Sequence, residues 1–297
     1  MPSGRTTRSL HGGHESHHGA RVPGQIGCRA ARPTPSLRQR PLPAGLARRE
    51  CTRRAGSGKE RWVCWWHNRM SQNLDILQAS ALLSALDEKK LTVLAQVSRL
   101  CSVVRGEAIW GHGSDVEFFG VIHKGFVQMV RTAPTGVEAT IEVIGPTQVF
   151  GLLGTLDNEG CPLRAEAMTD VSFLRVPKTH FRAIYESSPR MKEVMMQRTI
   201  GRLRSTQNLL ALLSGGRVEQ RVSAILLTLA RSYGEETPDG VRLQIPVTRQ
   251  ELAQLAGTTI ETAIRTVSRW QKEGLVTTKD HHITLRNPET LRQIVEG

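Results

Sequence analysis

The 297-residue chain has few aromatic residues, an odd number of cysteines and no long apolar run. Aromatic residues make up only 4% of the chain and hydrophobic residues 39%. A membrane-spanning helix needs roughly 18 or more consecutive apolar residues, and none occur, so an integral membrane protein is excluded. The five cysteines stand at irregular spacings, which argues against a secreted domain held together by disulfide bonds. The length predicts about two domains.

Acidic residues are scarce only near the N-terminus. The chain carries 40 Lys and Arg against 27 Asp and Glu, a formal net charge of +13. Residues 1–69 hold 13 Arg and one Lys against three Glu, which accounts for +11, together with six of the 14 Pro. Their apolar residues follow neither a helical nor a strand period. We expect a disordered basic tail, because such a segment cannot bury enough apolar surface to offset its ordering entropy.

Several interpretations of this tail compete. We favour an over-extended gene start with translation from Met70, because patterned sequence begins just after this residue. A nucleic-acid-binding arm and an organelle transit peptide are the alternatives suggested by its arginine content. A metal site is disfavoured because nothing fixes the geometry of its histidines, which are His11, His14, His17 and His18.

Residues 70–187 read as short helices followed by a β-rich domain. Apolar residues at helical spacing occupy 74–100, and short β-rich runs separated by turn residues follow over 101–180. Lys124-Gly125 is expected to join a hairpin, Pro134-Thr135-Gly136 to make a second turn, and Ala165–Val176 to form a last strand pair. Strands this short predict a small antiparallel barrel or roll.

Residues 188–214 predict one long helix. Ser188-Pro189 suits a helix start, and Gly215-Gly216 suits its end. One narrow apolar seam repeats at spacings of four and three and comprises Met196, Ile200, Leu203, Gln207 and Leu210. This is coiled-coil spacing, so we expect a dimerisation helix; packing on its own domain is the alternative.

Residues 215–297 predict a winged helix-turn-helix. Thr248 and Glu251 form a capping box for a helix that ends at Gly257, and Thr259 can cap a second helix that ends before Gly274. Two β-rich runs, 275–277 and 283–285, then bracket a turn and predict a hairpin wing.

The second helix of this motif has two distinct faces. Ala263, Val267 and Trp270 share the face expected to be buried. The opposite face carries Glu261, Ile264, Arg265 and Ser268, near the end where a recognition helix meets base edges in the major groove. Arg265 can donate to guanine and Glu261 can accept from cytosine. The alternative is a surface salt bridge between these two residues, which stand four apart.

Val247–Leu275 resembles the helix-turn-helix of the bacterial Crp/Fnr regulators, which open the first helix with Thr-Arg-Gln-Glu and read DNA with Glu-Thr-x-x-Arg. The resemblance covers residues 74–297. Gly106-Glu107, Gly113, Gly125, Val149-Phe150-Gly151 and the helix after Pro189 fall where that family has its β-roll and dimer helix.

The resemblance implies specific contacts. Thr248, Arg249 and Gln250 match residues that contact the DNA backbone, and Glu261 and Arg265 match the base-reading pair. Ile260 places the chain closer to the Fnr branch, which implies a pseudo-palindromic site of TTGAT-like half-sites. Ile264 departs from the small or hydroxyl residue usual there and can pack against a thymine methyl group. The expected DNA-binding set is Thr248, Arg249, Gln250, Thr258, Thr259, Ile260, Glu261, Ile264 and Arg265.

The effector is not identified by the sequence. Where relatives hold a cyclic nucleotide with Gly-Glu and Arg-Ser, this chain has Gly151-Leu152 and Cys161-Pro162, which disfavours a cyclic nucleotide. Cys28, Cys51, Cys64, Cys101 and Cys161 are too scattered to favour an iron–sulfur cluster. Haem remains an alternative effector, because it needs only one or two protein ligands. A redox-active Cys161 in a polar loop is a further alternative. The candidate haem ligands are His112, His123, His180, Cys101, Cys161 and Met168.

Together these observations predict an α+β protein with an antiparallel β-roll sensor domain (70–187), a long dimerisation helix (188–214) and a C-terminal winged helix-turn-helix (215–297). The function expected is a homodimeric, cytoplasmic transcription regulator, not an enzyme, with double-stranded DNA, a small effector and, by resemblance, RNA polymerase as partners. The alternative is a β-roll ligand-binding module that regulates a protein partner.

Overall fold

The computed structural model describes residues 70–157 and 159–297. The predictions made for residues 1–69 therefore lie outside the described residues. Within them, no helix combines the length and apolar character that crossing a membrane would take.

The first described segment is helical, as predicted for this part of the chain. Residues 70–79 form a helix, followed by η1 (Leu83–Ala85) and α2 (Glu88–Val97). Asp87 caps α2, because its side chain accepts a hydrogen bond from the backbone of Lys90 at 2.9 Å.

The β-roll domain consists of two four-stranded antiparallel sheets. One sheet has the strand order β1-β8-β3-β6 and the other β2-β7-β4-β5. The strands of the first are β1 (Arg99–Val103), β8 (Val171–Pro177), β3 (Phe118–Lys124) and β6 (Val149–Phe150). The strands of the second are β2 (Ala108–Trp110), β7 (Arg164–Ala167), β4 (Val127–Thr132) and β5 (Glu138–Ile144). The short helix α3 (Leu152–Leu156) follows β6.

Two of the predicted strand pairings are wrong. The Lys124-Gly125 turn does not close a hairpin, because β3 and β4 belong to different sheets. The 165–176 segment likewise splits, with β7 in one sheet and β8 in the other. Gly125 (φ 83°) is a corner between the sheets, where an added Cβ would lie 2.3 Å from the carbonyl oxygen of Asp170. The turn expected at Pro134-Thr135-Gly136 is confirmed, since β4 and β5 pair through 133–137.

Packing between and around the two sheets uses separate apolar clusters. Phe150, Phe173 and Ile122 lie in a cluster with the inner faces of both sheets. Phe119 and Phe181, 4.8 Å apart between ring centroids, belong to a second cluster that joins one sheet to the N-terminal helices and to α4 (Lys178–Glu186).

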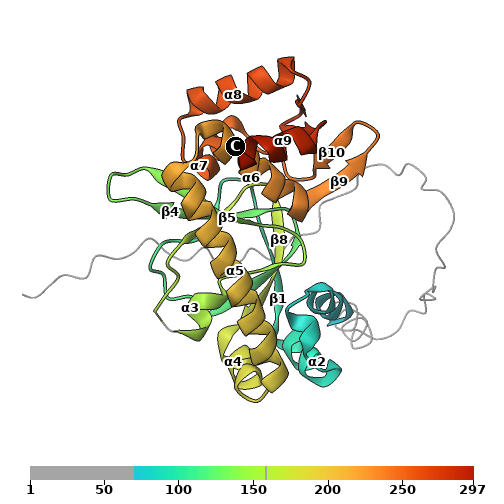
Figure 1. The fold of residues 1–297 in the computed structure, drawn as a ribbon. Coiled ribbons are helices and arrows are strands. Elements are labelled where there is room, and N and C mark those ends of the chain that lie inside the picture. Colours follow the sequence, from blue (N-terminus) through green and yellow to red (C-terminus); the bar gives the residue numbers. More distant parts are fainter. Residues whose placement is uncertain (1–69, 158) are drawn as a thin grey trace, which may run out of the picture.

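Helix α5 (Pro189–Gly215) confirms the predicted long helix. The backbone N–H of Met191 lies 3.4 Å from the Ser188 hydroxyl, which accepts from it at the helix start. At 1.5 Å per residue its 27 residues span ~40 Å. It crosses the molecule from α4 to the C-terminal domain (Figure 1). The predicted seam is not buried by its own chain, because Met196, Leu203 and Leu210 are 57–63% exposed.

The C-terminal domain begins with α6 (Val218–Tyr233). Its sheet has the order β11-β12-β10-β9, formed by β11 (Val276–Lys279), β12 (His282–Leu285), β10 (Gly240–Leu243) and β9 (Gly234–Thr237). Its remaining helices are α7 (Arg249–Ala256), α8 (Ile260–Lys272) and α9 (Pro288–Glu296). Helix α8 lies at the end of the molecule opposite α4 (Figure 1).

Candidate nucleic-acid interface

Helix α7 begins at the predicted capping box. The Thr248 hydroxyl accepts from the backbone N–H of Glu251 at 3.1 Å, and the Glu251 carboxylate accepts from the Thr248 N–H at 2.7 Å. Gly257 follows the last turn in the left-handed conformation (φ 57°), which glycine adopts without steric cost. These local contacts confirm the predicted start and end of the first helix.

Helix α8 is oriented by its cap and by its buried face. The Thr259 hydroxyl accepts from the backbone of Thr262 at 3.3 Å. Ala263 and Val267 are fully buried and Trp270 is 1% exposed, which confirms the predicted inner face. The tight turn between Gly257 and Thr259 and this buried face fix which side of α8 points outward.

The outward face of α8 carries the predicted base-reading residues. Glu261, Arg265 and Ser268 are exposed, and Ile260 and Ile264 are 42% and 44% exposed. The pKa of Glu261 lies below its usual range, because its own backbone N–H and the Thr259 hydroxyl donate to the carboxylate. Glu261 is therefore an ionised acceptor at the helix N-terminus.

Ion pairs of α8 lie at its other end. Arg269 contacts Glu219 of α6 at 2.7 Å and Glu273 at 3.5 Å, which ties the C-terminal half of α8 to the domain. Among the ion pairs of residues 159–297, neither Glu261 nor Arg265 takes part. The surface salt bridge considered as the alternative use of these two side chains is not formed here.

The hairpin of β11 and β12 confirms the predicted wing. Asp280 (φ 50°) and His281 (φ 62°) make its two-residue turn, and both have the positive φ that matches a type I′ turn. Arg249 on α7 reaches this hairpin and donates to the Thr278 hydroxyl at 3.1 Å. Burial lowers the pKa of Arg249, whereas Gln250 beside it is exposed.

Comparisons with known proteins agree with this geometry. Residues 220–294 match the family model of a Crp-like helix-turn-helix domain, and residues 100–188 match that of a cyclic nucleotide-binding domain. The CRP-like cAMP-activated global transcriptional regulator of Mycobacterium tuberculosis is 25% identical over 73% of this chain and 97% of its own length. The fumarate and nitrate reduction regulatory protein of Escherichia coli is 23% identical over 70% of this chain and 84% of its own.

A solved structure shows the same fold. FixK2 from Bradyrhizobium japonicum superposes with a TM-score of 0.60 at 23% identity, over 67% of this chain and 97% of FixK2. The chain belongs to the Crp/Fnr family of transcription regulators. Members of this family are DNA-binding regulators, typically homodimers, and not enzymes.

The sensor domain of this Crp/Fnr regulator differs from its DNA-binding end. Gly151 (φ 78°) precedes α3, and an added Cβ there would lie 2.5 Å from the Trp110 ring. Trp110 stacks on Phe150 at 5.1 Å and donates from its indole to the carbonyl oxygen of Leu163 at 3.1 Å. Aromatic packing thus covers Gly151, the glycine that the resemblance matches to the family's ribose-binding pair.

The phosphate position of this sensor domain also lacks a cation. Cys161 is 2% exposed and its backbone pairs with the 113–114 segment. Arg164, the nearest arginine in sequence, lies 2.8 Å from the Glu138 carboxylate and 3.0 Å from that of Glu166. A phosphate needs a positive or donor-rich cradle, and these residues do not fit a cyclic nucleotide.

The burial of Cys161 disfavours the alternative of a redox-active thiol in a polar loop. The side chain is packed in the apolar cluster between the sheets, and burial raises its pKa to about 11, with Asp157 and Asp115 adding to the shift. Such a raised pKa disfavours the thiolate at neutral pH, and the thiolate is the reactive form of cysteine.

The remaining candidate effector ligands are dispersed. Cys101 and Met168 lie in apolar clusters, whereas His112 and His180 are exposed and His123 is half-buried. Within residues 70–157 and 159–297, no three His, Cys, Asp or Glu side chains gather as metal ligands would.

Residues that join the two domains were missed by sequence reasoning. Arg105 of the sensor lies 3.5 Å from Glu251 of α7, and the Thr140 hydroxyl of β5 lies 3.4 Å from the Gln254 amide. Glu251 was recognised only as a helix cap. No local pattern marks such contacts, since each depends on how two domains meet.

Proposed function

We propose that the protein is a homodimeric regulator that reads a pseudo-palindromic, TTGAT-like site through α8, in the cytoplasm and with RNA polymerase as its further partner. The observation that carries the proposal is the outward face of α8. Glu261 and Arg265 stand one turn apart on it, exposed and outside the ion pairs of α8, on a helix whose other face is buried. This is the arrangement with which a recognition helix reads base edges in the major groove.

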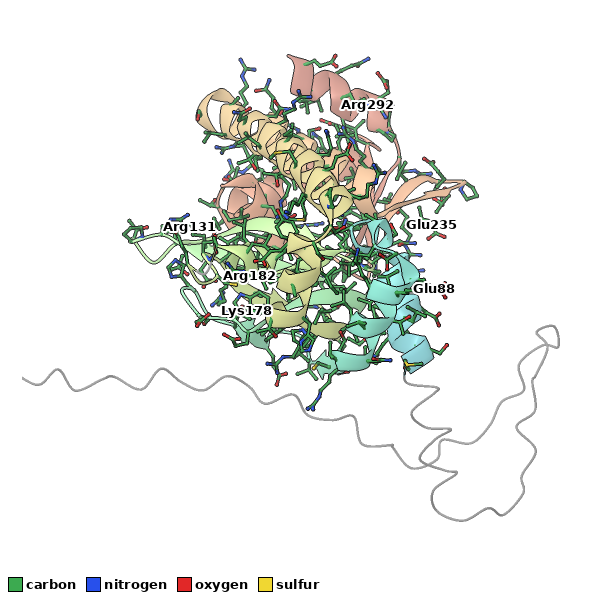
Figure 2. The ribbon with its side chains drawn as sticks, turned by 90° about the horizontal axis from the view of Figure 1, so that it is seen from below. Glu88, Arg131, Lys178, Arg182, Glu235 and Arg292 are labelled. Atoms are coloured by element: carbon green, nitrogen blue, oxygen red, sulfur yellow. The ribbon has the colours of Figure 1, made fainter. Side chains whose placement is uncertain are left out.

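In this proposal the N-termini of α7 and α8 contact the DNA backbone and position the domain on it. Thr248, Arg249, Gln250, Thr258 and Thr259 gather at these ends, where free N–H groups attract phosphate. Residues 215–297 carry 11 Lys and Arg against 10 acidic residues, so placed contacts rather than bulk charge must supply affinity. Figure 2 labels one basic and one acidic residue of this domain, Arg292 on α9 and Glu235 on β9.

Dimerisation in this proposal uses the seam of α5. Met196, Ile200, Leu203, Gln207 and Leu210 are exposed in the single chain. Their coiled-coil spacing suits a second copy of the same helix. Residues 70–187 would then form each sensor, 188–214 the dimer helix and 215–297 the DNA-binding domain. Two recognition helices would enter successive major grooves about 34 Å apart.

The effector in this proposal is a small molecule other than a cyclic nucleotide. Trp110 covers Gly151, Cys161 replaces the phosphate-binding cation, and Arg164 is held by two carboxylates. Haem is not included, because Cys101, Cys161 and Met168 lie in packed apolar clusters and the candidate histidines are dispersed over the surface of the described residues.

Substitution of the base-reading pair tests the function. Glu261→Ala and Arg265→Ala should each weaken binding to a duplex with inverted TTGAT half-sites by about 1–3 kcal/mol, measured by fluorescence anisotropy at fixed salt. Arg292→Ala, which removes one exposed positive charge from α9, is the matched control and should leave specific binding unchanged. Full sequence-specific binding by the Glu261→Ala, Arg265→Ala protein would overturn base reading by α8.

The alternative of a β-roll module that regulates a protein partner without DNA binding is not favoured. Both helices of the motif are capped, the wing is formed, and the family consists of DNA-binding regulators.

A further inference from the structure

A chain of polar side chains crosses the sensor sheet β2-β7-β4-β5 and ends on α7. Its members lie on β7, β4, β5 and α7 and are Arg164, Glu166, Gln128, Thr140 and Gln254. The distances between successive polar atoms are 3.0, 3.0, 3.2 and 3.4 Å. Arg164 begins β7 directly after the segment that holds Cys161. The chain thus joins that segment of the sensor to the first helix of the DNA-binding motif.

The hydrogen bonds along this chain converge on the Glu166 carboxylate, which accepts from Arg164 on one side and from Gln128 Nε2 on the other. The amide oxygen of Gln128 in turn accepts from the Thr140 hydroxyl at 3.2 Å. Gln254 Oε1 lies 3.4 Å from the same hydroxyl, which donates its single proton to one amide oxygen or the other.

Burial makes the central members of this chain costly to leave without partners. Thr140 is 5% exposed and Gln128 is 7% exposed. A buried amide or hydroxyl that loses its partner forfeits more than the net contribution of an ordinary hydrogen bond. Of the bonds along the chain, only that between Thr140 and Gln254 requires α7 to sit on β5 in this register.

Apolar contacts between the domains do not by themselves fix the position of α7 along β5. Phe126, Val143 and Met168 of the sensor belong to the same apolar cluster as the core of the C-terminal domain. Phe126 meets Tyr233 edge-on at 5.3 Å, and the Tyr233 hydroxyl lies 2.9 Å from the carbonyl oxygen of Val143. Apolar attraction is non-directional, so the register of α7 depends on its polar contacts with the sensor, which include Thr140 with Gln254 and Arg105 with Glu251.

We propose that Thr140 and Gln254 are positioning residues that hold α7 in register on β5 and thereby set the orientation of α8 for DNA. The inference rests on the proposed function for its DNA readout alone. In the docked arrangement the outward face of α8 stays exposed, so this register is compatible with base reading. A displacement of Arg164 at the start of β7 would be passed to α7 through Glu166, Gln128 and Thr140.

The test compares Thr140→Val, Gln254→Leu and the double variant in the full-length protein. Hydrogen–deuterium exchange of α7 in the free protein and affinity for the inverted TTGAT duplex are measured together. Each single variant should raise exchange in α7 several-fold and weaken DNA binding ~3–10-fold, the equivalent of about one net hydrogen bond. The double variant should be no weaker than Thr140→Val, because the two changes remove the same contact.

Two control variants separate positioning from general destabilisation. Thr140→Ser keeps the hydroxyl and should restore both readouts. Thr228→Val removes an exposed hydroxyl that bonds only within α6 and should change neither. Unchanged exchange of α7 in Thr140→Val, or effects that multiply in the double variant, would overturn the inference. If the wild-type protein fails to bind the duplex, the proposed function fails, while the exchange measurement still decides the positioning role.

Discussion

The outward face of α8 and the region between α3 and β7 both lie where the chain resembles its family, yet their side chains have opposite environments. On α8, Glu261 and Arg265 are exposed and outside the ion pairs of the helix. In the sensor, Cys161 is buried and Arg164 is bound by two carboxylates. A side chain that binds a ligand must be accessible to solvent and must not be engaged in other contacts. The difference supports our proposal that DNA recognition follows the family pattern and effector recognition does not.

The largest expected effect tests whether the exposed seam of α5 binds a second copy of the chain, as the exposed face of α8 is proposed to bind DNA. Leu203→Glu should abolish the dimer, because each charge would be buried without a counter-ion at an expected cost of ~3–5 kcal/mol. Sedimentation velocity measures the mass. Val93→Glu, on an exposed aliphatic residue of α2 outside the seam, is the control and should remain dimeric. A Leu203→Glu protein with the mass of the wild type would rule out this seam.

The next prediction concerns the buried side chain of Cys161 in the sensor domain. With its pKa raised from 9.0 to about 11, Cys161 keeps its proton at pH 8, so its thiolate fraction is ~100-fold below that of an ordinary thiol. Alkylation by iodoacetamide, followed by peptide mass spectrometry, should be slower by at least this factor in native than in guanidinium-unfolded protein. The native rate should rise about tenfold per pH unit up to pH 10, since thiolate accumulates only as the pH nears 11. Rapid native alkylation at pH 8 would show that Cys161 is accessible and reactive.

The smallest expected effect concerns Ile264 on the exposed face of α8. Replacement of thymine by uracil in the half-sites removes only the methyl group that Ile264 is expected to contact. Wild-type protein should bind the uracil duplex ~2–4-fold more weakly, as expected for about one buried methyl group. Ile264→Ala should bind both duplexes equally, and Ile260→Ala shows which of the two exposed isoleucines is responsible. Equal binding of both duplexes by the wild type would exclude thymine-methyl reading.

The docking of α7 on β5 connects these two regions and shows where sequence reasoning stops. Thr248 and Glu251 were recognised as a capping pair because their contact spans three residues of one helix. The same Glu251 lies 3.5 Å from Arg105, a residue far away in the sequence. No periodicity predicts that contact.

The sheet topology illustrates the same division. The turn at 133–137 was predicted correctly because β4 and β5 pair with each other. The Lys124-Gly125 turn has an equally clear local signal, yet β3 pairs with β8 and β6 instead of β4. Glycine allows a sharp change of direction in either case. Which strand becomes the neighbour depends on how two sheets close around one apolar core.

The sequence by itself determined the long helix α5, the two capped helices of the motif, the inner face of α8 and the turn of the wing, because these depend on residues within one or two turns of each other. Only the tertiary structure decided which sheet each strand joins, that Cys161 is buried, that Arg164 is bound by Glu138 and Glu166, and that Thr140 meets Gln254. These outcomes rest on contacts between segments distant in the chain, where packing and burial rather than local propensity set the free energy.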